Sequence, residues 1–425
     1  MRKKVICAPL SLLPKTLDVD TAYFATYAIP QRPGIGYFGS TLPKDVTTAG
    51  LAPDIIVWDF LTIALSVASA DEAIERNKSE DGWTRQIDLQ IHLSEPANWQ
   101  PCKALLEQTL RFLTGDYWYL SFLPNGVKPP ENKKKLILNN DCVMLLSGGL
   151  DSLIGAIDFA ESGKNPIFVS QKVRGEVEHQ MLFAKTILPN TPHMQWNHNI
   201  NRPFKGGEPS TRGRSIIFIA YAALAASAIK HIKRVPIIVP ENGFISLNIA
   251  LTPARQSSFS TKTTHPIYLS GIQTVWNRLG LDIELQTPYK FKTKGEMVSE
   301  CKNQSLLRLL IGKTVSCGKY LRNNRTHCGR CLPCLVRRSA LFHSEVQDTP
   351  ERGYRYTLLN GRRKDGADDI GAVLYACENI RKNGLHSQIL GALSFASPDA
   401  RQLYQNLLKR GFEELRAYLE KEGML

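Results

Sequence analysis

The chain has 425 residues, of which 43% are hydrophobic and 22% charged, a composition that excludes a disordered or fibrous protein. Its length predicts two or three domains. Lysine and arginine outnumber aspartate and glutamate by 53 to 39, so the formal net charge is +14. That excess attracts nucleotides, nucleic acid and acidic partners alike, and by itself identifies none of them.

Residues 1–125 predict an N-terminal α+β extension. The first 15 residues begin like a secretory signal, but two prolines interrupt the apolar stretch, so we expect a strand there and no export signal. Further strands are expected at 54–60, 85–93 and 116–123, with a helix over 102–115. Pro, Gly and Lys are concentrated just beyond, which predicts a solvated linker over 126–135.

Residues 136–345 alternate short apolar strands with helices, which is typical of a parallel sheet with crossover helices. Strands are expected at 142–147, 166–171 and from 235, and helices after the first two. The longest apolar run, Ser215–Ile232, is too short to cross a bilayer and predicts a buried helix. Residues 346–425 predict a helical C-terminal extension, with Ser397 capping its last helix.

The sequence Ser-Gly-Gly-Leu-Asp-Ser, residues 147–152, lies between a predicted strand and a predicted helix. Backbone N–H groups at such a turn bind phosphate, and the two serine hydroxyls add donors. Asp151 is placed to hold Mg²⁺ or to cap the helix. The loop lacks the lysine of a Walker motif and the spacing of a nucleophile elbow. A turn without a ligand is the alternative interpretation.

Four of the nine cysteines form a C-x10-C-x2-C-x2-C pattern made by Cys317, Cys328, Cys331 and Cys334. Clustered cysteines without an export signal are typical of a reducing compartment, so we expect a cytoplasmic protein. Four thiolates at this spacing predict a structural Zn²⁺ site. An iron–sulfur cluster is the alternative.

The loop, the element TKGEMV at 293–298 and the four cysteines together resemble QueC, the 7-cyano-7-deazaguanine synthase family of PP-loop ATPases. The resemblance covers about residues 138–342 and implies an adenine nucleotide alpha hydrolase-like parallel sheet with flanking helices and a zinc-clamped loop. The long N-terminal domain and helical tail are similar to the extended QueC-like proteins of antiviral defence operons, the QatC type.

The resemblance implies that ATP adenylates the carboxylate of 7-carboxy-7-deazaguanine and releases pyrophosphate. Ammonia then captures the acyl group as an amide, and a second activation dehydrates the amide to a nitrile. ATP and Mg²⁺ would bind at Ser147, Gly148, Gly149, Asp151 and Ser152, with Gln171 near the adenosine. Because charge develops at phosphorus and at the acyl carbon, cations are needed there. The candidate catalytic residues are the cations Lys294 and Arg214, together with Asp151. The candidates for substrate binding are Arg212, Glu241, Asn242 and Arg255.

Two segments depart from the synthase pattern: VSQKVRGE at 169–176 replaces a Tyr-Gly-Gln element, and TRGRS at 211–215 replaces an Arg-Asn pair. These departures lead to the hypothesis that an amine of a partner protein from the same operon replaces ammonia, with the N-terminal domain docking that partner. A PP-loop enzyme that modifies tRNA is one alternative, and nucleic acid is not the favoured ligand. A nucleotide-binding scaffold without catalytic activity is another.

Overall fold

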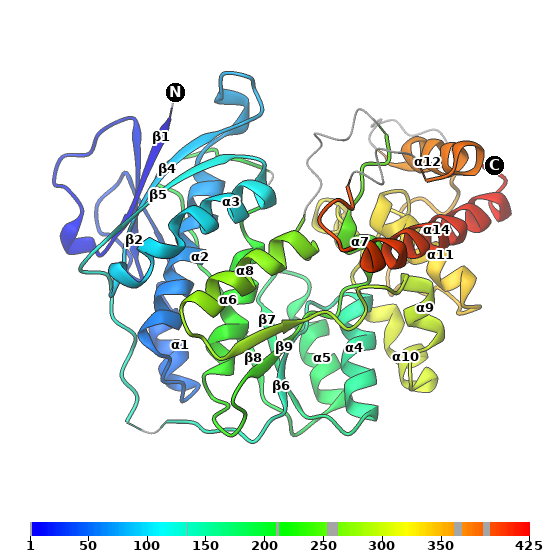
Figure 1. Cartoon of the computed structure of the whole chain (residues 1–425), viewed down its shortest axis with the longest axis horizontal. Coiled ribbons are helices and arrows are strands. Elements are labelled where there is room, and N and C mark those ends of the chain that lie inside the picture. Colours follow the sequence, from blue (N-terminus) through cyan, green and yellow to red (C-terminus); the bar gives the residue numbers. More distant parts are fainter. Residues whose placement is uncertain (1, 134, 210–211, 253–261, 361–367, 386–391) are drawn as a thin grey trace.

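The computed structural model describes residues 2–133, 135–209, 212–252, 262–360, 368–385 and 392–425. Two five-stranded sheets dominate it, and every strand pair in both sheets is parallel. Helices lie between the sheets and flank the second one, while a group of helices from the C-terminal part lies to one side (Figure 1). The expected α/β fold is therefore confirmed.

The first sheet is built from the N-terminal residues in the order β3-β2-β1-β4-β5. Its strands are β1 Lys3–Ala8, β2 Thr21–Thr26, β3 Ile35–Phe38, β4 Gln86–His92 and β5 Tyr117–Leu123, and its helices are α1 Leu42–Thr48, α2 Ile55–Ala73 and α3 Lys103–Thr114. The parallel pairing corrects one detail of the expected α+β extension, since helices connect parallel strands here instead of standing apart from an antiparallel sheet.

The strand expected at residues 54–60 is wrong, because this segment begins helix α2. Nearly every residue of α2 from Val57 to Asp71 is buried. A helix that is buried on all sides has no polar face, so its apolar residues do not recur every 3.6 residues. Such a sequence cannot be distinguished from a buried strand by its pattern of apolar residues.

The second sheet has the order β10-β9-β6-β7-β8. Its strands are β6 Cys142–Leu145, β7 Pro166–Gln171, β8 His193–Trp196, β9 Val235–Ile238 and β10 Ile283–Gln286. Helices α4 Leu150–Glu161, α5 Val177–Ile187, α6 Ser215–Ala226 and α8 Pro266–Arg278 pack around it. β7 and β9 lie on opposite sides of β6, and this is the arrangement that opens a crevice at the carboxyl ends of the strands.

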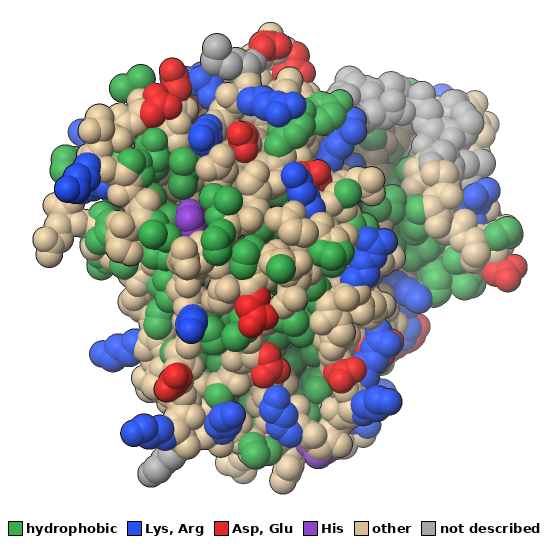
Figure 2. All heavy atoms as spheres, turned by 60° about the vertical axis from the view of Figure 1, so that its left-hand side comes forward, with side chains coloured by type: hydrophobic (Ala, Val, Ile, Leu, Met, Phe, Trp, Pro, Cys, Tyr) green, Lys and Arg blue, Asp and Glu red, His purple; other side chains and the backbone are tan. Residues whose placement is uncertain are grey.

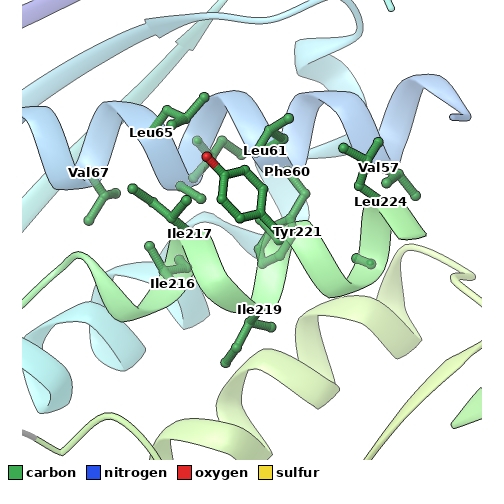
Figure 3. Close-up of a cluster of buried hydrophobic side chains, with 14 of the residues drawn as sticks. Val57, Phe60, Leu61, Leu65, Val67, Ile216, Ile217, Ile219, Tyr221 and Leu224 are labelled. Carbon is green, nitrogen blue, oxygen red and sulfur yellow. The ribbon is translucent and has the colours of Figure 1, made fainter. Parts of the chain in front are cut away.

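The two sheets share one hydrophobic core, because α2 of the first packs on α6 of the second and α3 packs on α8. Figure 3 shows the side chains of Val57, Phe60 and Leu61 on α2 facing Ile217 and Tyr221 on α6. All five are buried. The core therefore continues across the sequence boundary at 126–135, and the division into domains stays a prediction.

The last part of the chain is helical, as expected. Its helices and those that follow β9 are α7 Gly243–Leu247, α9 Lys294–Ser299, α10 Gln304–Leu310, α11 Leu332–His343, α12 Ile370–Asn383 and α14 Pro398–Lys421. The Ser397 side chain accepts a hydrogen bond from the backbone N–H of Ala400 and caps α14, at the residue expected. Within the described ranges, every helix is too short or too polar to span a bilayer.

Candidate active site

A cavity of about 460 Å³ lies at the carboxyl ends of the strands of the second sheet. This volume is within the roughly 300–1,000 Å³ of small-molecule sites. Its walls come from the turn after β6, the end of β7, the segment after β9 and the starts of α6 and α9. Nine of the expected site residues line it: Ser147, Gly149, Asp151, Ser152, Gln171, Arg212, Arg214, Glu241 and Lys294.

The turn at 147–152 forms an open border of this cavity. Gly148 has a φ of +87°, a conformation that favours glycine, and its carbonyl accepts a hydrogen bond from Val315 N at 3.0 Å. Ser152 Oγ donates to Gly149 O at 2.9 Å, while Ser147 is exposed. The turn leads directly into the first turn of α4, whose N–H groups have no partners within the helix. An anion in the cavity would therefore meet backbone donors and the positive end of a helix dipole.

Asp151 lies in the first turn of α4, and three donors surround its carboxylate. Lys294 Nζ forms an ion pair with Oδ1, and Asn242 donates to Oδ2 from its backbone N at 3.1 Å and from Nδ2 at 2.7 Å. Burial raises the pKa of Asp151, but the lysine and the two Asn242 donors outweigh it and hold the pKa below its ordinary value. A Mg²⁺ ion at Asp151 would therefore have to share or displace Lys294.

The local sequence of the TKGE element explains how Lys294 is held. Thr293 and Glu296 form a capping box: Thr293 Oγ1 accepts from Glu296 N at 3.0 Å, and Glu296 Oε2 accepts from Thr293 N at 2.8 Å. Lys294 is the first residue of α9, and its side chain is 8% exposed. The capping box fixes the backbone from which the lysine reaches Asp151.

Arg212 and Arg214 both line the cavity but have different surroundings. Arg212 is buried, donates from Nη1 to Thr114 O at 2.8 Å, and has its pKa lowered to about 10 by burial and by nearby Arg76. Arg214 is exposed, and in the part of the chain that the structure describes it has no carboxylate within ion-pair distance. Its guanidinium is thus available to an anionic ligand.

The segment that carries these arginines is held by a buried ion cluster of the N-terminal part, made of Asp71, Arg76, Arg85 and Asp116. Asp116 bonds Arg76 at 2.6 and 2.7 Å and Arg85 at 2.7 Å, and Arg85 also pairs with Asp71. Asp71 Oδ2 accepts from Gly213 N at 2.6 Å, between the two arginines of the cavity. Burial of these charges is offset only because each one is paired.

Two carboxyl groups in the cavity have raised pKa values. Burial and the nearby Asp151 raise the pKa of Glu241 to about 8, against the opposing effect of Lys294. Burial raises the pKa of Glu176 to about 7, with Arg214 opposing. Glu176 borders the cavity beside Gln180, and sequence reasoning identified neither as a site residue. Their place after the carboxyl end of β7 is the signal that could have found them.

The remaining candidate residues differ in whether they face the cavity. Gln171 lines the cavity and its Nε2 is 2.8 Å from His198 Nδ1. Asn242 is fully buried behind the lining: its Nδ2 bonds Asp151 and its Oδ1 accepts from Ile245 N at 2.9 Å. Both ends of its amide are therefore used inside the protein, although Asn242 was a candidate for substrate binding. Gly148 belongs to the turn, and Arg255 lies outside the described residues.

The four cysteines form a second, separate centre. All are buried, and their sulfur atoms lie within 4.8 Å of one another. The sulfur pairs Cys317–Cys331 and Cys328–Cys334 are each 3.9 Å apart, close to the about 3.8 Å edge of a zinc–thiolate tetrahedron. Backbone N–H groups donate to the sulfurs of Cys317 and Cys328 at 3.2–3.4 Å, as expected around thiolates. This donor set fits Zn²⁺ in a closed structural site.

Comparisons with known proteins agree with this geometry. Residues 208–345 match the family model described as "Queuosine biosynthesis protein QueC". The match includes the segment with Arg212 and Arg214, the two residues Glu241 and Lys294, and the four cysteines, while the turn at 147–152 precedes it. No curated protein matches the chain. The match covers less than half of the chain, and together with the turn and the thiolate cluster it supports a QueC-like PP-loop unit in this part of the protein.

Proposed function

We propose that the protein uses ATP to adenylate the carboxylate of a 7-deazaguanine acid similar to 7-carboxy-7-deazaguanine. An oxygen of the carboxylate attacks the α-phosphorus of ATP, the bond from that phosphorus to the bridging oxygen breaks, and pyrophosphate leaves. A nitrogen nucleophile then attacks the acyl carbon, and AMP leaves with the carboxylate oxygen. The reaction is a carbon–nitrogen ligation that forms AMP.

The observation that carries this proposal is that the turn at 147–152, Lys294 and Arg214 line one cavity. In this proposal the turn would offer backbone donors to the β- and γ-phosphates, and the two cations would offset the negative charge that develops at the α-phosphate. Mg²⁺, when bound, would supply further positive charge to the phosphates. Because burial and Asp151 raise the pKa of Glu241 to about 8, its carboxyl group is mostly protonated at pH 7. It can then donate a hydrogen bond to a heterocycle as well as accept one.

The acceptor is ammonia or an amine of a partner protein, and we place the chain in the extended, antiviral-defence branch of the family. The long N-terminal and C-terminal parts support this placement. Figure 2 shows Lys and Arg interspersed with acidic and apolar side chains on the face that includes the N-terminal sheet. Such a mixed surface favours a protein over a nucleic acid, which would select a continuous basic stripe.

The test is a reconstitution of the whole chain with ATP, Mg²⁺ and 7-carboxy-7-deazaguanine, with and without ammonia or proteins encoded beside it. Mass spectrometry of the products should show AMP, pyrophosphate and either an amide or nitrile, or a protein with an added deazapurine. A free nitrile without any protein adduct would exclude the partner amine. Dependence of AMP release on RNA instead of the acid would favour a tRNA-modifying enzyme, and no turnover of ATP would favour a scaffold.

A further inference from the structure

Helix α14 of the C-terminal extension packs on the two short helices that follow or begin with the residues bonded to Asp151, which are Asn242 and Lys294. It contacts α9, which begins at Lys294, and α7, which begins directly after Asn242. Figure 1 shows α14 beside α7 and α9, at the edge of the second sheet's helices. A helix more than 100 residues away in the sequence thus contacts both segments that supply hydrogen-bond or ion-pair partners to Asp151.

The contact with α9 is polar and buried. Glu414 on α14 is 6% exposed, and its carboxylate accepts hydrogen bonds from Thr293 Oγ1 and from Gly295 N, the latter at 3.3 Å. These two residues flank Lys294 in the sequence. A Cβ at position 295 would lie 2.6 Å from Glu414 Oε1, so only glycine lets the carboxylate approach this closely.

A second polar contact holds the capping box of α9. Arg410, one turn before Glu414, pairs with Glu296 and donates from Nη2 to Phe291 O at 2.9 Å. Since Glu296 closes the capping box with Thr293, α14 bonds both side chains of the box that begins α9.

The contact with α7 is apolar and equally close. A Cβ at Gly411 of α14 would lie 2.3 Å from the ring of Phe244, and a Cβ at Gly243 would lie 2.6 Å from Leu407 Cδ2. Gly243 N also donates to Tyr289 O and to Lys292 O, each at 3.0 Å. Helix α7 is therefore held between α14 and the segment that leads into α9, and this fixes Asn242 at its N-terminus.

We propose that α14 is part of the active site's supporting structure, and that Glu414 is a positioning residue that holds Lys294 in place for adenylation. The expected effect on turnover rests on the proposed function. The effect on the environment of Lys294 does not, because the chemical reactivity of this lysine is measured without any turnover. This proposal gives the C-terminal extension a role in catalysis, in addition to any role in docking a partner or in stability.

The test uses the full chain with Glu414→Gln, which keeps the side chain's size but replaces one acceptor by a donor facing Gly295 N. The control is Glu413→Gln, the exposed neighbour on the same helix. Partial acylation of lysines, followed by mass spectrometry, measures the reactivity of Lys294 against exposed Lys164. We expect a rise of about five- to thirtyfold for Lys294 in Glu414→Gln and none in the control.

The second measurement is pyrophosphate release at steady state. Because small misplacements of a catalytic group cost about a hundredfold, we expect kcat to fall about ten- to hundredfold, with a smaller change in the KM for ATP. Unchanged Lys294 reactivity and unchanged kcat in folded Glu414→Gln would overturn the proposal. If Glu414→Gln does not fold, Arg410→Gln takes its place with the same expected results and the same overturning result.

The two proposals fail in different ways. A wild-type protein that releases no pyrophosphate, but whose Lys294 becomes reactive in Glu414→Gln, would refute the proposed reaction and keep the positioning role. A wild-type protein that releases pyrophosphate at the same rate as Glu414→Gln, with Lys294 unreactive in both, would refute only the positioning role.

Discussion

Lys294 pairs with Asp151 across 143 positions of sequence, and the pair is almost completely buried at the end of the turn at 147–152. Neither charge is stable there without the other, since an unpaired buried ion costs several kcal/mol. The lysine also neutralises the carboxylate of the turn itself, so Asp151 adds no net negative charge to the cavity. The first prediction concerns this pair.

Replacing Asp151 by Asn should leave Lys294 without its counter-ion. We expect pyrophosphate release to fall by about a hundredfold or more, and the free energy of unfolding to fall by about 3 kcal/mol. Denaturant titration and a coupled pyrophosphate assay measure the two effects. The matched control is Asp158→Asn on the same helix, outside the cavity lining; a similar loss of turnover there would point to α4 as a whole and not to the ion pair.

Glu241 should give the protein's stability a distinct pH dependence. Its pKa is about 8 in the folded protein and about 4.5 in an unfolded chain, so the folded state binds the extra proton between these values. Stability from this group is therefore full below about pH 4.5 and falls as the pH rises to about 8. Glu241→Gln should flatten the decline between pH 5 and pH 8 in denaturant titrations. An equally steep decline in the variant would contradict this assignment.

Removal of the metal from the four-cysteine centre should destabilise the segment between α10 and α12. Elemental analysis should find about one zinc and no iron per chain. A strong chelator, or Cys331→Ser, should lower the thermal midpoint and expose this segment to proteolysis, because metal binding and folding are coupled in such centres. Visible absorption from an iron–sulfur chromophore in anaerobically purified protein would contradict the zinc assignment.

The buried ion cluster of the N-terminal part should matter for the cavity. Asp116→Asn weakens the pairing of Arg76 and Arg85, so we expect a loss of about 3 kcal/mol in the free energy of unfolding. Because the cluster holds Gly213 and shares the Thr114 carbonyl with Arg212, the candidate for binding the acid, the KM for the acid should rise more than the KM for ATP. Asp88→Asn on strand β4, outside the cluster, serves as the control; equal changes in both Michaelis constants would argue against a specific link to Arg212 and Arg214.

Much of the site was predictable from the sequence because many of its residues lie in short, contiguous motifs. The turn at 147–152 and the four cysteines each belong to a local pattern with a chemical reason for its residue types and spacing, whereas Lys294 was found through the resemblance of its TKGE element to the QueC family. The strands of the second sheet were predictable for a similar reason, since short apolar segments alternate there with helices.

The rest depends on contacts between distant segments, which no local pattern records. Asn242 follows a strand end just as Glu241 does, yet its side chain turns inward to Asp151 and Ile245 N. In the sequence, Glu414 is indistinguishable from the other acidic residues of an amphipathic helix. Only the packing of α14 against Gly295 shows that its carboxylate is a buried hydrogen-bond acceptor. Helix α2 was mistaken for a strand because it is covered both by strands β2, β3 and β4 of its own sheet and by helix α6 of the second sheet, and this tertiary packing removes the polar face that marks a surface helix.

The most direct test of the central claim uses 7-carboxy-7-deazaguanine labelled with ¹⁸O in its carboxylate. Adenylation transfers a carboxylate oxygen to the α-phosphate, so AMP formed by the wild-type protein should contain one ¹⁸O atom and pyrophosphate none. Formation of ADP and phosphate, or AMP without the label, would show that the cavity beside the Ser147–Ser152 turn does not join AMP to the acid.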